Sequence, residues 1–283
     1  MSDDEVRVPT GVGMTAIGVA AIRAHESRRD DRLFDDPLAT RFLAAAGWTA
    51  PTAAEIEPRR ARWRMLLVAS IPIRTRFLDD YLRAATDAGC RQVVLLGAGL
   101  DTRAYRLAWP DGTRLFEVDL PDMVGFKNAV LSDVTPSCDR VPVIADLTDD
   151  WPTALKTAGF DPTAPTAWVA EGLLVYLTEE QNESLLTDIA ALSVPGSHLA
   201  LTSLDPGRLD AIRERHADGP THSVVRLWRS SAPEDPVAWL ARYGWRATAY
   251  DPAERAASYG RPNLFDAFEN PPSSRGLVSA VRI

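Results

Sequence analysis

The feature that most constrains the fold is a regular alternation, from residue 91 onward, of short apolar runs with stretches of helical character. Such alternation is typical of βαβ units, in which helices cover a mainly parallel sheet. One intervening helix is clearly marked, because Thr178 and Gln181 stand at the two key positions of a capping box. The expected strands are the runs 92–96, 114–118, 140–145, 167–170, 197–201, 245–250 and 277–283. The sequence therefore predicts an α/β fold with a mainly parallel sheet of seven strands.

Residues 1–88 have helical periodicity instead and are predicted to form a helical N-terminal extension. One helix is expected to begin at Asp36 and Pro37, because these residues suit the N-cap and the first helical position. A longer helix is expected over 58–88, with Pro72 inside it as a kink.

A length of 283 residues suits a single domain. We therefore expect one domain over 1–283, with the extension preceding a core at 89–283. The segment 205–236 is polar and less regular than its surroundings. Together with the extension it is expected to close over a site as a lid.

The charge and composition of the chain argue against several classes of function. The chain has 31 basic and 39 acidic residues and a net charge of −8, which opposes a nucleic-acid partner. It lacks the pattern of a signal peptide and has no apolar run of about 20 residues, so a cytoplasmic protein away from membranes is expected. Cys90 and Cys138 have neither metal-type nor disulfide spacing, and no metal site is expected. Abundant alanine and arginine, with Lys127 and Lys156 as the only lysines, indicate a GC-rich bacterial genome.

A glycine-rich turn follows the first expected strand. Gly97, Ala98 and Gly99 come directly after the apolar run 92–96. Glycines at such a place allow a tight turn and the close approach of a ligand to the backbone, although many serve the turn alone. A dinucleotide fingerprint would place a third glycine where this chain has Thr102, so the loop does not favour a pyrophosphate.

Acidic residues follow three of the expected strands. They are Asp119, which stands 22 residues after Gly97, Asp146 and Glu171. Each one alone also fits a helix N-cap or a solvated loop acid. In an open parallel sheet, however, the carboxyl ends of the strands meet in one crevice, where an acid in the place of Asp119 can bind both hydroxyls of a ribose. Three carboxylates there would repel the phosphates of NAD and would suit a cationic nucleoside cofactor.

Several motifs together are similar to those of one family. They are GAGLDTR at 97–103, FEVDLP at 116–121, ADL at 145–147 and AEGLLVYL at 170–177, preceded by AHESRR at 24–29, DDPLA at 35–39 and RTRF at 74–77. In this order, over roughly residues 15–205, the chain resembles the leucine carboxyl methyltransferase family and its bacterial relatives. The resemblance implies a Rossmann-like class I methyltransferase sheet and S-adenosylmethionine as the cofactor. A bacterial enzyme of secondary metabolism is expected.

The resemblance also implies which residues contact the nucleoside part of the cofactor. The turn of Gly97, Ala98 and Gly99 would line it, and Asp119 would hold the ribose. Asp146 and the backbone of Leu147 would contact the adenine.

Three further residues are implied for the amino-acid part. Glu171 would face the amino group, and Arg74 would pair with the carboxylate, to which a guanidinium can donate two hydrogen bonds. Without the resemblance, Arg74 would be interpreted as an exposed charge on an arginine-rich helix. The family also uses a basic residue near its N-terminus, for which Arg23 is the candidate here.

The acceptor side of the site is less defined. Tyr176 could border the acceptor cavity or belong to the core, and His222 and Arg226 could contact the acceptor or be solvated. We expect in-line transfer of the methyl group to an oxygen of a small molecule. A carboxylate is ionised near neutral pH and needs no general base, whereas a phenol would need one such as His222. The lack of an evident catalytic residue favours the carboxylate.

Two other functions stay open at this point. A Rossmann-type oxidoreductase would bind NAD, against which Thr102, Asp146 and Glu171 speak. A protein that binds S-adenosylmethionine without catalysis would carry the same motifs as an enzyme.

Overall fold

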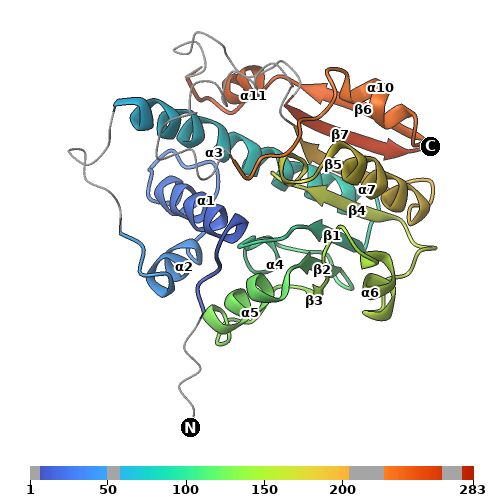
Figure 1. Ribbon diagram of the computed structural model, residues 1–283, viewed down its shortest axis with the longest axis horizontal. Helices are drawn as coiled ribbons and strands as arrows, with labels where there is room; N and C mark the ends of the chain where they lie inside the picture. Colours follow the sequence, from blue (N-terminus) through green and yellow to red (C-terminus); the bar gives the residue numbers. More distant parts are fainter. Residues whose placement is uncertain (1–6, 50–57, 204–225, 263–275) are drawn as a thin grey trace.

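The computed structural model describes residues 7–49, 58–203, 226–262 and 276–283, and its centre is one sheet of seven strands (Figure 1). The strands are β1 (Gln92–Leu96), β2 (Arg114–Asp119), β3 (Asp139–Ile144), β4 (Thr166–Ala170), β5 (His198–Thr202), β6 (Trp245–Tyr250) and β7 (Leu277–Arg282). Each lies within one residue of the expected run, so the apolar periodicity predicted the sheet correctly.

The strand order is β3-β2-β1-β4-β5-β7-β6. Strands β1 to β5 run parallel to one another, and β7 is antiparallel to both β5 and β6. The predicted mainly parallel sheet is therefore confirmed. Because the chain leaves β3 at one edge and returns as β4 on the other side of β1, the strand order reverses between β1 and β4. The carboxyl ends of the strands on the two sides of such a reversal enclose the crevice in which open α/β sheets bind ligands.

The N-terminal part of the chain contains α1 (Val12–Ser27), α2 (Ala39–Ala45) and α3 (Pro58–Asp87), which includes Pro72 as predicted. The start predicted for α2 at Asp36 and Pro37 is wrong by two residues. The Asp36 carboxylate does accept a hydrogen bond from the backbone N–H of Ala39, at 3.2 Å, but its other oxygen is taken by an arginine of α1.

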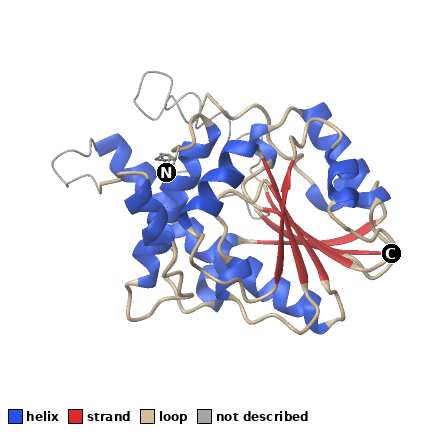
Figure 2. Ribbon diagram, turned by 90° about the horizontal axis from the view of Figure 1, so that it is seen from below, coloured by secondary structure: helices blue, strands red, loops and turns tan. Residues whose placement is uncertain are grey.

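The remaining helices cover the sheet on both faces (Figure 2). They are α4 (Arg103–Arg106), α5 (Pro121–Val130), α6 (Trp151–Thr157), the 3-10 turn η2 (Leu174–Tyr176), α7 (Glu179–Ala191), α10 (Pro236–Ala241) and α11 (Pro252–Ser258). The capping box before α7 is present, since Thr178 and Gln181 each accept a backbone hydrogen bond from the other. None of the helices in the described ranges is long and apolar enough to cross a membrane.

Two apolar clusters hold these layers together. On one face of the sheet, Trp168 of β4 packs edge-to-face against Trp151 of α6 and is itself fully buried. On the other face, α3 buries Leu78 and Leu82 against the sheet, and the hydroxyl of Tyr81 donates a hydrogen bond to the Trp168 carbonyl oxygen at 3.1 Å. Burial of this extent fixes the strands rigidly, so the side chains at their ends have defined positions.

Candidate functional site

The turn after β1 has the geometry that its two glycines predict. Gly97 and Gly99 have φ angles of 62° and 49°, in the region that residues with a Cβ rarely adopt. The backbone N–H of Gly97 donates to the Val118 carbonyl oxygen at 2.9 Å, which ties the turn to the end of β2. A Cβ added to Gly97 would lie 3.1 Å from Cδ1 of Leu173. The backbone conformation therefore favours glycine here, and a larger residue would also require the Leu173 side chain to shift slightly.

Asp119 ends β2 directly beside this turn. Its Oδ2 accepts a hydrogen bond from the Gly99 N–H at 2.5 Å, and its Oδ1 accepts one from the Leu120 N–H at 2.7 Å. Burial raises the pKa of Asp119 despite these two bonds. A carboxylate has about four lone-pair directions, so two hydrogen bonds leave it able to accept further donors.

Glu171 directly follows β4, on the other side of β1 from Asp119, and lies between two arginines. Its Oε1 is 2.7 Å from Nε of Arg74, and its Oε2 is 2.7 Å from Nη1 of Arg103. Burial raises the pKa of Glu171, but the guanidinium groups of Arg103 and Arg74 outweigh it and hold the pKa at about 2. Glu171 is therefore ionised at any physiological pH. The structure thus brings together Arg74 and Glu171, which are 97 residues apart in the chain.

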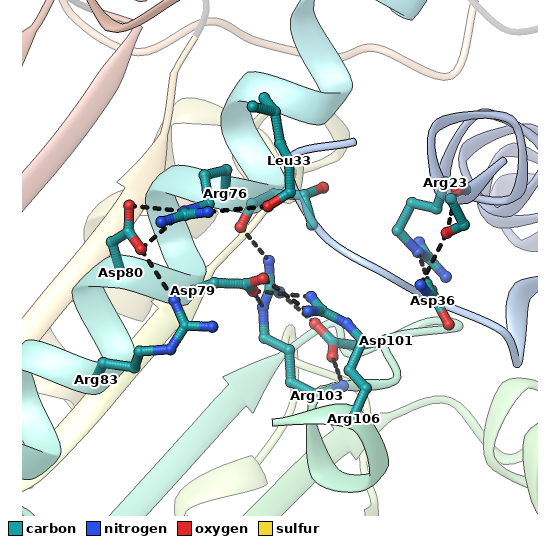
Figure 3. A network of polar contacts seen from close by, with 12 residues as sticks. Arg23, Leu33, Asp36, Arg76, Asp79, Asp80, Arg83, Asp101, Arg103 and Arg106 are labelled. Atoms are coloured by element: carbon teal, nitrogen blue, oxygen red, sulfur yellow. Dashed lines mark hydrogen bonds and ion pairs between the residues drawn. The ribbon is translucent and has the colours of Figure 1, made fainter. Parts of the chain in front are cut away.

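Arg103 belongs to the GAGLDTR motif, which implies no role for it, and it lies at the centre of an ionic network (Figure 3). Besides Glu171 it contacts Asp101, the Thr75 carbonyl oxygen at 3.3 Å and Oδ1 of Asp79 at 2.7 Å. Asp79 also binds Arg106, at 2.6 Å and 2.8 Å. The signal in the sequence was slight: an arginine two residues after an aspartate, at the start of the helix that follows the glycine turn.

Arg23 lies close to the same turn and is buried. Its Nε is 2.7 Å from Oδ2 of Asp36, and its Nη2 donates to the Leu100 carbonyl oxygen at 2.6 Å. Its positive charge also contributes to the low pKa of Glu171. Arg23 thus anchors α1 to the glycine turn, and its predicted contact with a cofactor stays a prediction.

Asp146 and Leu147 follow β3, next to the end of β2. Asp119 is in register with Ile144, two residues before Asp146. The Asp146 side chain is exposed, and its Oδ1 accepts hydrogen bonds from the N–H and the hydroxyl of Thr148, both at 2.8 Å. Leu147 packs at the margin of the core. The two residues thus follow the strand next to β2, on the side of Asp119 and away from Glu171.

The acceptor-side candidates are placed only in part. The hydroxyl of Tyr176 donates to Oγ1 of Thr15 at 3.2 Å and so connects η2 to α1. Arg226 is exposed in a turn. His222 lies outside the described residues, as does most of the predicted lid segment. Within the described ranges, no group of three or more His, Cys, Asp or Glu side chains is arranged to hold a metal ion.

The fold and the site define the class of protein. A seven-stranded sheet with this strand order, a glycine turn after β1 and an acid after β2 is the Rossmann-like fold of class I methyltransferases. A DUF574 family protein of Streptomyces avermitilis has a similar crystal structure, with a TM-score of 0.57, 16% identity and coverage of 93% of this chain and 97% of that one. A Thermobifida fusca protein described as a methyltransferase has a TM-score of 0.54 at 19% identity, covering 86% and 92% of the two chains.

Sequence comparison defines the family. The leucine carboxyl methyltransferase family model matches residues 16–190. A Streptomyces coelicolor protein, named as an inferred S-adenosyl-L-methionine-dependent methyltransferase, is 49% identical over 97% of this chain and 96% of its own length. A protein of the same description from Streptomyces avermitilis is 47% identical over the full length of both chains. The chain belongs to the leucine carboxyl methyltransferase family.

Proposed function

We propose that this protein transfers the methyl group of S-adenosylmethionine to an oxygen of a small-molecule acceptor, and that this oxygen belongs to a carboxylate. Membership of the family makes the chain a methyltransferase, and its relatives are described as dependent on S-adenosyl-L-methionine. S-adenosylmethionine is accordingly its cofactor. The oxygen, the carboxylate and the small size of the acceptor are the finer parts of the proposal.

The observation that carries the cofactor part of this proposal is the ion pair of Arg74 and Glu171. An α-amino acid is a zwitterion, and this pair offers one group of each sign at 2.7 Å separation. Arg74 would bind the carboxylate of the cofactor and Glu171 its ammonium group, because each charge then meets its opposite. The side chain of Glu171 is 17% exposed and that of Arg74 is 22% exposed, so neither is fully buried.

The nucleoside side of the crevice fits the same cofactor. The turn of Gly97, Ala98 and Gly99 has no side chain larger than a methyl group to keep the nucleoside from the backbone. Asp119 retains lone pairs for the ribose hydroxyls. Asp146 and Leu147 would contact the adenine. Thr102 is buried at the place where a third glycine would admit a pyrophosphate, which disfavours NAD.

In this reaction the protein would align the acceptor with the methyl group and exclude water from the site. When bound, the cofactor supplies an electrophilic methyl group, so a strong acid or base is not needed for an acceptor that is already ionised. Tyr176 and Arg226 are our candidates for contacts with the acceptor. A hydroxyl acceptor would instead require a base, for which His222 is the candidate.

A lid formed by residues 1–88 and 205–236 would provide the exclusion of water. Two contacts support this. A Cβ on Gly99 would lie 3.6 Å from the Cβ of Ala16, so α1 lies directly over the glycine turn. The hydroxyl of Ser230 donates to the Leu177 carbonyl oxygen at 2.7 Å, so the end of the predicted lid packs on η2. We propose that the enzyme acts in the bacterial cytoplasm, in secondary metabolism.

Methyl transfer to a carboxylate can be tested with methyl-labelled cofactor. The purified protein is incubated with the labelled cofactor and a small-molecule extract of the producing cell. The proposal expects a labelled product that releases methanol in mild base, as methyl esters do. A labelled product stable to base would be an ether or an amine and would contradict the carboxylate. No labelled product in any extract, despite cofactor binding, would favour a protein that binds the cofactor without catalysis.

A further inference from the structure

Arg103 pairs with Glu171, and the family motif in which it stands implied no role for it. It is 1% exposed, and its guanidinium contacts groups from three segments: Asp79 and Thr75 of α3, Asp101 of the glycine turn, and Glu171 at the end of β4. It therefore connects α3 both to the segment that follows β1 and to the residue that follows β4.

We infer that Arg103 is a positioning residue: it holds the Glu171 carboxylate ionised and oriented toward the crevice, where Glu171 receives the ammonium group of the cofactor. This inference rests on the proposed role of Glu171 in binding the cofactor. Arg103 itself lies behind Glu171, buried from the crevice, and acts through it.

The geometry distinguishes Arg103 from the other cation that Glu171 contacts. Arg74 is partly exposed, and the proposed function requires it to bind the carboxylate of the cofactor. Arg74 therefore has a second partner when the cofactor is bound. Arg103 has its remaining hydrogen-bonding groups on Asp79, Asp101 and Thr75, all within the protein. It can hold Oε2 of Glu171 in the same place whether or not the cofactor is present.

The rigidity of Arg103 follows from its own partners. A guanidinium is planar and donates in several fixed directions, so three anchors define its orientation. Asp79 is buried and pairs with both Arg103 and Arg106, so its negative charge has two cationic partners. A lysine at position 103 would keep the charge but could not reach Asp79, Asp101 and Glu171 together, because an ammonium is a compact group on a flexible stem.

Arg103 also sets the charge balance around Glu171. The charged groups that face Glu171 are Arg103 of α4, Arg74 of α3 and, at longer range, Arg23 of α1. Asp101 contacts the same Nη1 of Arg103 as Glu171 does. Without Arg103, Asp101 would repel Glu171, and burial would raise the pKa of Glu171 from about 2. A protonated Glu171 binds an ammonium group poorly.

The test compares matched substitutions at Arg103 and Arg106, which share Asp79 but differ in their contact with Glu171. Binding of S-adenosylmethionine to the full chain is measured by calorimetry. We expect Arg103→Lys to weaken binding about tenfold, the loss of a charge-assisted hydrogen bond, and Arg106→Lys to leave it nearly unchanged.

The pH dependence supplies a readout that a purely structural role would not move. In Arg103→Gln, affinity is expected to fall as the pH is lowered from about 7 to 5, while Arg106→Gln follows the wild type. Asp119 titrates alike in both variants, so its contribution cancels in the comparison. If Arg103→Gln does not fold, as judged by thermal melting, Arg103→Lys alone decides, since it retains a cation for Asp79.

The outcomes separate this inference from the proposed function. Normal binding by the wild type with equal losses in Arg103→Lys and Arg106→Lys would overturn the positioning role alone. Unchanged binding in Glu171→Gln would overturn the role of Glu171 and the inference with it. A wild type that does not bind S-adenosylmethionine would overturn the proposed function.

Discussion

The backbone N–H of Gly99 donates a 2.5 Å hydrogen bond to Oδ2 of Asp119, and this bond joins the turn after β1 to the end of β2. Gly99 has a φ angle of 49°, a conformation that glycine adopts readily, and its N–H donates this bond from within the turn. The position of the carboxylate is thus set by the backbone of the glycine turn and not by another side chain. As a result, the turn after β1 and the carboxylate at the end of β2 are held together as one unit.

Asp119→Ala is expected to weaken binding of S-adenosylmethionine by roughly 10- to 100-fold, the loss of one or two charge-assisted hydrogen bonds. Calorimetric titration measures the change. Asp122→Ala is the matched control, because Asp122 is an exposed acid on the next turn of the chain. Equal dissociation constants for Asp119→Ala and the wild type would contradict the assignment of the ribose to Asp119.

Gly97→Ala is expected to destabilise the protein by about 1–2 kcal/mol, because alanine is strained at a positive φ. It should also weaken cofactor binding, since Leu173 must move away from the new methyl group. Gly112→Ala separates the two effects: its φ is 76° and a Cβ there has nothing within 4 Å. Denaturation should show similar losses in both variants, and titration a loss of affinity in Gly97→Ala alone. Full affinity in Gly97→Ala would mean that the turn does not contact the cofactor.

Lys127→Met is expected to lower the free energy of unfolding by about 2 kcal/mol, since it leaves a buried carboxylate with one cation fewer. Lys127 is 1% exposed, and its Nζ is 2.8 Å from Glu117, which also pairs with Arg140. Urea unfolding provides the measurement. Lys156→Met, which removes the exposed lysine of α6, should unfold at the same urea concentration as the wild type. A Lys127→Met protein as stable as the wild type would show that Arg140 alone compensates Glu117.

Acid should destabilise the protein through Glu171 and Asp79. Arginines hold the pKa of Glu171 at about 2 and lower that of Asp79, against the effect of burial in both cases. A carboxyl whose pKa is lowered on folding adds stability above its unfolded pKa and loses it as the pH falls toward the folded value. Melting temperatures should therefore decline from about pH 4.5 toward pH 2. Glu171→Gln should flatten part of this decline, and an identical decline in that variant would contradict the low pKa of Glu171.

The fold could be predicted from the sequence because its signals are local. Apolar runs and turn residues define each strand by itself, and the capping residues before α7 do the same for that helix. The antiparallel direction of β7 had no such signal. The direction of β7 depends on its insertion between β5 and β6, which follows from tertiary packing and not from a local sequence signal.

The candidate site could be predicted only where a motif coincides with a strand end. Gly97, Asp119 and Glu171 stand at or directly after strand ends, and for that reason the sequence could single them out as candidates. The arginines that pair with Glu171 were harder to predict, because Arg74 is 97 residues away in the chain. The alternative interpretation of Arg74 as an exposed charge on its helix is wrong, since it pairs with Glu171. Arg103 was missed as the centre of the network because an arginine with several carboxylate partners looks like any other in sequence. The structure places these residues, but the cofactor contacts proposed for Arg74, Gly97, Ala98, Gly99, Asp119 and Glu171 stay predictions, as do those of Arg23, Asp146 and Leu147.

We propose that the ends of β1, β2 and β4 bind a nucleoside that carries an amino-acid group and a net positive charge. Calorimetric titration of the wild-type chain with S-adenosylmethionine, followed by a competing titration with NAD, tests this. We predict saturable binding of one S-adenosylmethionine per chain, which an excess of NAD does not displace. Binding of NAD with no heat from S-adenosylmethionine would contradict the account.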